Sequence, residues 1–245
     1  MDKQEEWLRH MTELRKRLIV VLGVFGAALA AGLYVSPQVL LYLKRQPAAG
    51  AVEWNVFAFT DGLFVYLRCA VLVAALITLP VLLYQIWAFA RPGLTEREAK
   101  GTLAYVPVSF VLFLGGVAFS YYLVFPMMLR FMMQLNARIG ALETYGIDRY
   151  FSFLFNVVVP LGLSFEMPLV MLFLTRLGVL TPQRLRAVRK YAYVGLAVFA
   201  SCISPPDAVS HLSVLIPLLA LFELSALLAT RVYYRRHRAA LQPQS

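Results

Sequence analysis

Six apolar runs, most of them near 20 residues long, limit how this chain can fold. A helix needs about 20 consecutive apolar residues to cross a hydrocarbon core about 30 Å thick. In that core only helices and closed barrels satisfy their backbone hydrogen bonds. The pattern therefore predicts an all-α integral membrane protein, a single polytopic domain over residues 1–245. Its six predicted transmembrane helices cover residues 18–36, 66–90, 103–125, 150–175, 191–203 and 212–230.

The composition agrees with lipid as the solvent of this chain. Hydrophobic residues make up 60% and charged residues 15%, whereas a soluble domain averages about 45–50% apolar and about 25% charged residues. Prolines inside the later spans are expected to bend their helices, which predicts a curved, concave bundle. These prolines are Pro80, Pro107, Pro160, Pro168 and Pro217.

The net charge of +10 would suggest nucleic acid as a partner in a soluble protein, but here its placement indicates membrane topology. If the N-terminus lies in the cytoplasm, four cytoplasmic segments carry 17 of the 23 basic residues, as the positive-inside rule requires. These segments are residues 1–17, 91–100, 176–190 and 231–238. The alternation holds only if the short run 191–203 crosses, which puts both termini and the tail 231–245 in the cytoplasm.

The segment before the first span is basic, so a cleaved signal peptide has to be weighed against a retained span. Its acidic residues and the later apolar runs favour a retained span. Within residues 1–17 the apolar spacing predicts a cytoplasmic amphipathic helix lying among the headgroups. A charged lead-in that only sets the topology is the alternative. The apolar face is formed by Trp7, Met11, Leu14 and Leu18.

Carboxyl groups are scarce, which makes their positions informative. Glu166 and Glu223 lie inside predicted spans, where a charge costs roughly 3 kcal/mol or more. Each is either a functional polar site or a neutral acid satisfied by nearby hydroxyls. Glu98 lies in a cytoplasmic loop, where it can complete a capping box with Thr95 or take a guanidinium in a bidentate pair.

The last outer loop offers a second polar group. Asp207 caps the final helix or lines a polar mouth together with His211, one turn further on. The three histidines have no metal-ligand spacing, and there is no phosphate loop or nucleophile elbow. We therefore expect no metal, no cofactor and no enzymatic activity. Cys69 and Cys202 are interpreted as small packing residues.

Taken in order, several motifs resemble the TatC family, the receptor component of the twin-arginine protein translocase. The start HMTELRKRL, at 10–18, is similar to the family's HLxELRxRL. Residues 84–89, YQIWAF, with Pro92-Gly93-Leu94 and Glu98 resemble its first cytoplasmic loop, and residues 162–168 match GxxFExP. The remaining matches are Phe113, Gly116, Phe119, Tyr121, Phe125-Pro126, Pro205-Pro206-Asp207, Pro217 and Phe222-Glu223.

The resemblance implies six cupped spans in the bacterial cytoplasmic membrane and binding of twin-arginine signal peptides on folded cargo. It also implies assembly with the single-span subunits TatA and TatB, self-association, and transport driven by the proton motive force. Glu98 would be the main carboxylate for the arginine pair, with Glu13 and Arg17 completing that surface. Glu166, with His211 and Glu223, would form the intramembrane site for a partner, and Asp207 would be the outer-loop acid.

Two residues differ from the family's usual pattern, and two other classes of protein are also compatible with the sequence. Ser204 stands where the family usually has Thr, and His211 stands where Gln is usual. A proton-coupled secondary transporter of a small solute would also use bent helices and a mid-membrane acid, although no internal repeat is visible. A passive structural subunit of a membrane complex is compatible with the composition as well.

Overall fold

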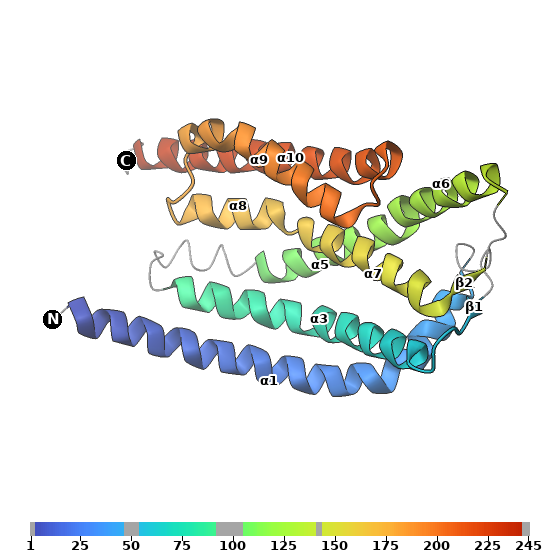
Figure 1. The fold of residues 1–245 in the computed structure, drawn as a ribbon. Helices are drawn as coiled ribbons and strands as arrows, with labels where there is room; N and C mark the ends of the chain where they lie inside the picture. The colour runs from blue at the N-terminus through green and yellow to red at the C-terminus, as the bar shows by residue number, and fades with distance from the viewer. Residues whose placement is uncertain (1–2, 47–53, 92–104, 141–143, 242–245) are drawn as a thin grey trace. The chain divides into compact units, whose positions relative to one another are not determined.

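The computed structural model describes residues 3–46, 54–91, 105–140 and 144–241, which are mostly helical (Figure 1). Two short strands, β1 (Trp54–Asn55) and β2 (Tyr145–Gly146), pair in parallel. The helices are α1 (Lys3–Lys44), α3 (Asp61–Ala90), α5 (Tyr105–Phe119), α6 (Phe125–Arg138), α7 (Ile147–Ser164), α8 (Met167–Arg176), α9 (Pro182–Ile203) and α10 (Ala208–Leu241), with a π-helical segment at Ser120–Val124.

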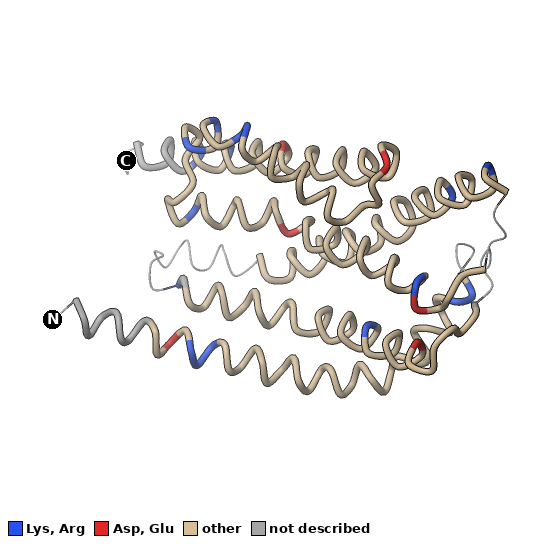
Figure 2. Tube along the Cα trace, viewed as in Figure 1, with Lys and Arg blue, Asp and Glu red and all other residues tan. Residues whose placement is uncertain are grey.

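Five helical stretches in the described residues are long and apolar enough to cross a membrane. The predicted span 191–203 lies in α9, which is 22 residues long and is not among the five. Basic residues gather in its first turns (Figure 2) and exceed what a candidate span tolerates, so its crossing remains a prediction. The five stretches are Met11–Lys44, Asp61–Phe89, Tyr105–Arg138, Ile147–Arg176 and Ala208–Arg235.

The chain forms two compact units, described separately below. The first comprises Met1–Phe110 with Thr144–Phe155, and the second comprises Val111–Glu143 with Asn156–Ser245.

In the first unit α1 and α3 run antiparallel along each other (Figure 1). The helix α1 continues through the predicted amphipathic segment into the span without a break. Met11, Leu14 and Leu18 are all exposed, which leaves an apolar face open along this part of the helix. A location among the headgroups remains a prediction.

The opposite end of the first unit is joined by side chains and strands. Arg68 on α3 donates from Nη1 to Asp148 Oδ1 at 2.8 Å and also to Ser152, both on α7. The β1–β2 pair aligns Trp54 with Tyr145. The strand pair ties the segment after α1 to the segment before α7, and Arg68 ties α3 to α7, although these parts are far apart in sequence.

Small residues allow α1 and α3 to approach closely. Gly32 is buried, and a Cβ built on it would lie 2.6 Å from the carbonyl oxygen of Ala70. Ser36 is fully buried and donates its hydroxyl to the Gly32 carbonyl at 2.6 Å. Cys69 is also fully buried, which confirms the packing interpretation for it. That interpretation is wrong for Cys202, whose side chain is exposed.

In the second unit the third predicted span continues beyond its expected end at residue 125. The N–H of Phe125 bonds to the Ser120 carbonyl five residues back, and Pro126 lies in the first turn of α6. A π-helical turn shifts the hydrogen bonding by one residue. The helix therefore accommodates Pro126 and continues as α6.

The fourth predicted span, 150–175, is divided into α7 and α8 by a turn at Phe165-Glu166. The N–H groups of Phe165 and Glu166 bond three residues back, to Gly162 and Leu163, both at 3.1 Å. Pro168 has no N–H to offer the carbonyl four residues earlier, so the regular helix stops. Two helices therefore replace the single one expected.

The core of α8, α9 and α10 is a cluster of buried apolar residues. Its buried members, Met171, Leu185, Phe222 and Ala229, come from all three helices. Five partly buried residues pack around them, namely Met167, Leu180, Ala192, Leu196 and Ala226. Interhelical packing thus holds α9 against α10 although α9 is the least apolar helix of the three.

The Gly32 contact yields a test of the first unit. Gly32→Ala places a methyl group against the Ala70 carbonyl, and overpacking of this kind costs about 1–3 kcal/mol. We expect a lower thermal unfolding midpoint in detergent. Gly26→Ala is the matched control, because nothing lies within 4 Å of its added Cβ, and there alanine is expected to stabilise the helix. Equal midpoints for the two variants would contradict the packing described.

Candidate functional site

Arg17 is the residue that joins the predicted binding surface together. Its Nη2 donates to Glu13 Oε1 at 2.6 Å and to the Ala88 carbonyl at 3.0 Å. Its Nη1 donates to Gln85 Oε1 at 3.1 Å. One guanidinium therefore links two turns of α1 to the last turns of α3, and it fixes the Glu13 carboxylate beside that helix end.

The end of α3 carries a further arginine contact. Trp87 is buried, and the guanidinium carbon of Arg91 lies 5.7 Å from the centre of its ring. This distance is within the range of a cation–π interaction. The predicted carboxylate Glu98 follows in sequence but lies outside the described residues, as does its alternative capping partner Thr95.

Glu166 sits at the turn between α7 and α8. It is 7% exposed and accepts the Val170 N–H through its carbonyl at 3.0 Å. The preceding Phe165 packs so closely on α5 that a Cβ on Gly116 would lie 2.7 Å from its ring. The acid is therefore held on an irregular stretch of backbone rather than within a regular helix.

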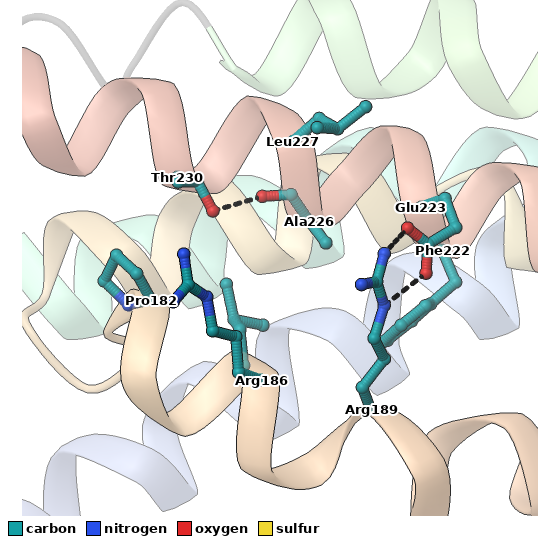
Figure 3. Close-up of a pocket in the computed structure, with 9 residues that line it drawn as sticks. Pro182, Arg186, Arg189, Phe222, Glu223, Ala226, Leu227 and Thr230 are labelled. Carbon is teal, nitrogen blue, oxygen red and sulfur yellow. Dashed lines mark hydrogen bonds and ion pairs between the residues drawn. The ribbon is translucent and has the colours of Figure 1, made fainter.

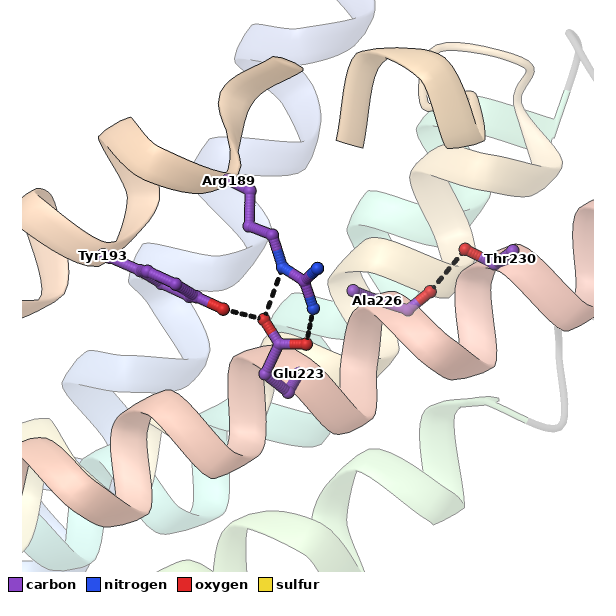
Figure 4. Close-up of polar contacts among 5 residues, drawn as sticks. All are labelled: Arg189, Tyr193, Glu223, Ala226 and Thr230. Atoms are coloured by element: carbon purple, nitrogen blue, oxygen red, sulfur yellow. Dashed lines mark hydrogen bonds and ion pairs between the residues drawn. The ribbon is translucent and has the colours of Figure 1, made fainter. Parts of the chain in front are cut away.

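Glu223 on α10 lines a pocket of about 180 Å³ between α9 and α10 (Figure 3). Its carboxylate receives Arg189 in a fork, Nε to Oε1 at 2.8 Å and Nη2 to Oε2. Tyr193 donates its hydroxyl to Oε1 as well (Figure 4). Three donors from α9 thus meet one carboxylate, which fits an ionised acid better than a neutral acid satisfied by hydroxyls.

Asp207 and His211 mark the beginning of α10. Asp207 Oδ1 accepts the Ser210 N–H at 2.7 Å, so the predicted helix cap is present. The Nδ1 of His211 lies 3.5 Å from the hydroxyl of Ser201 on α9. This polar edge therefore joins the two helices at the end opposite to the Glu223 pair.

The site residues predicted from sequence fall into separate groups. In the first unit Glu13 and Arg17 form an ion pair, while their role in peptide binding remains a prediction. In the second unit Glu223 and His211 have different partners and lie 12 residues apart, which is about 18 Å along a helix. Among the described residues neither bonds to Glu166. Groups of three or more possible metal ligands are likewise absent from the part of the chain that the structure describes.

Three residues that contact predicted site residues were not identified from the sequence. Gln85 was part of a matched motif but had no assigned role, and Arg189 was counted only as a topological charge. Tyr193 was read as part of an apolar run. A usable signal existed for the last two, because they are four residues apart on one helix face. Their common partner on α10 could not be chosen from spacing alone.

Taken together, the apolar helices and the ion pairs between them define a polytopic α-helical membrane protein. The family model of the Sec-independent protein translocase protein (TatC) matches residues 9–217. The chain belongs to this family. It is therefore a component of the twin-arginine protein translocase, a transport system rather than a class of enzymes.

Named relatives cover nearly the whole chain. The chain is 42% identical to Bacillus subtilis TatCy over 97% of its own length and 93% of the relative's. It is 44% identical to TatC of Halalkalibacterium halodurans over 91% and 88% of the two lengths. A crystal structure of the twin arginine translocase receptor TatC matches with a TM-score of 0.79 at 33% identity, covering 91% of this chain and 99% of that one.

The Glu223 pair can be tested by a double-mutant cycle. We expect Arg189→Gln and Glu223→Gln each to lower the unfolding midpoint in detergent, because each leaves one charge without its partner. The double variant should be less affected than the sum, with a coupling energy of about 1 kcal/mol. Tyr193→Phe, which removes one neutral donor, should have the smallest effect. Strict additivity of the two charge variants would argue against the pair.

Proposed function

We propose that this protein is the receptor of the translocase and binds twin-arginine signal peptides at the cytoplasmic end of the α1–α3 hairpin. In this proposal Glu98 is the main carboxylate and Glu13 is the second. Arg17 holds Glu13 in position and anchors α3, whose end leads into the segment that contains Glu98.

The Arg17 contacts are the observation that supports this proposal most directly. A guanidinium is already bound there by a carboxylate, a side-chain amide and a backbone carbonyl. Acceptors arranged in this way fit the planar fork of arginine better than the point charge of lysine. A peptide recognised by its arginines would need the same kind of acceptor set.

The charge distribution supports the orientation. With both termini in the cytoplasm of a bacterial inner membrane, the basic segments lie on the cytoplasmic side, where anionic lipids attract them. An incoming signal peptide is basic too, so the proposed carboxylates, Glu98 and Glu13, would provide specific contacts that the lipid does not.

Assembly and energy supply complete the proposal. We propose that the protein assembles with TatA, TatB and further copies of itself, and that the proton motive force drives transport. The buried Glu166 and the His211 edge are the polar groups at membrane depth to which partner helices would bind. The family match does not favour a small-solute transporter.

The decisive experiment is crosslinking of a twin-arginine signal peptide to the full-length protein in membranes. Glu98→Ala should reduce capture about tenfold or more, since charge-assisted hydrogen bonds contribute about 1.5–3 kcal/mol. Glu96→Ala, in the same segment and with the same change of charge, is the matched control and should retain capture. If both variants capture the peptide equally well, Glu98 is not the binding carboxylate.

A second experiment separates the role of Glu166. Glu166→Gln preserves size and hydrogen bonding but removes the ionisable group. We expect normal peptide crosslinking together with reduced export of a folded reporter and altered co-purification of the partner subunits. If Glu166→Gln abolished peptide capture first, Glu166 would belong to the peptide-binding site, and the proposed separation from partner assembly would be wrong.

A further inference from the structure

The pocket between α9 and α10 has a mixed lining that the proposed function does not use. Its volume is about 180 Å³. Both α9 and α10 contribute charged or polar as well as apolar residues to the lining. The lining residues are Pro182, Leu185, Arg186, Arg189, Phe222, Glu223, Ala226, Leu227 and Thr230.

Arg186 gives this pocket its net positive charge. The charge of Glu223 is compensated by Arg189, and Tyr193 adds a hydrogen bond to the same carboxylate. This ion pair therefore contributes no net charge to the pocket. Among the described residues Arg186 makes no ion pair. Figure 3 shows its side chain extending toward the Thr230 end of the pocket, away from the Arg189–Glu223 pair.

The pocket lies where the apolar part of α10 ends. Thr230 is followed by Arg231, and further basic residues continue toward the C-terminus. Leu227, on the pocket wall, is 57% exposed, which suits a surface in contact with lipid chains. In the predicted topology this end of α10 faces the cytoplasm, so the pocket would lie at the level where phospholipid headgroups meet their acyl chains.

We propose that this pocket binds the phosphate of an anionic phospholipid headgroup, with Arg186 as the principal donor. The glycerol and upper acyl chains would lie against Leu185, Phe222 and Leu227. Basic pockets between transmembrane helices take acidic headgroups in this way, and arginine binds phosphate through paired donors. The bound lipid would bridge α10 and α9, the helix whose basic first turns keep it from being a strong candidate span. This inference does not depend on peptide binding at Glu98.

Native mass spectrometry of the full-length protein in detergent tests this, with phosphatidylglycerol, phosphatidylcholine and inorganic phosphate as separate probes. The wild type should retain phosphatidylglycerol in preference to phosphatidylcholine. Arg186→Gln should weaken that retention about tenfold. Arg184→Gln is the matched control, because Arg184 lies on the same helix, donates to the Val179 carbonyl and does not line the pocket. It should retain the lipid as the wild type does.

A variant that changes shape instead of charge strengthens the test. Ala226→Leu fills the pocket and should also displace phosphatidylglycerol, while circular dichroism and size-exclusion chromatography report whether each variant is folded. Equal retention by Arg186→Gln and the wild type would overturn the proposal, and so would equal retention of the two lipids. Displacement of phosphatidylglycerol by inorganic phosphate at equal concentration would assign the site to free phosphate and overturn the lipid assignment.

Discussion

A polar group at membrane depth has to find its partner inside the protein, because hydrocarbon offers none. This constraint accounts for most of the polar contacts described. Hydroxyls within the apolar helices turn back to the carbonyl four residues earlier in the same helix, a local solution that needs no neighbour. Examples are Ser36, Ser120, Ser164, Thr175, Ser213 and Thr230.

Three arginines have acceptors on a neighbouring helix and so join helices. Arg17 links α1 to α3, Arg68 links α3 to α7, and Arg189 links α9 to α10. Each guanidinium has several acceptors or a fork of two, which is the arrangement that compensates for the loss of water. Arginine thus serves as the main polar connector between helices, and the proposed ligands of the protein, a twin-arginine peptide and an acidic lipid, use the same chemistry.

Proline and glycine shape the apolar helices between these connections. The division at Glu166 follows from Pro168, and the π-helical turn precedes Pro126. Glycine at positions 32 and 116 lets neighbouring segments approach to distances that a methyl group would forbid. Irregular backbone and close packing together hold Glu166 in a buried position that a straight helix would not provide.

Much of this was readable from the sequence, because apolar length, helix-breaking residues and charge alternation are local properties. They predicted an all-helical membrane protein, the approximate spans and the candidate functional acids. The partners were decided only by the tertiary structure: Gln85 lies 68 residues from Arg17, Asp148 lies 80 residues from Arg68, and Glu223 lies 34 residues from Arg189. Several acceptors were available to each arginine, and only the packing of one helix on another selects which pair comes within hydrogen-bonding distance.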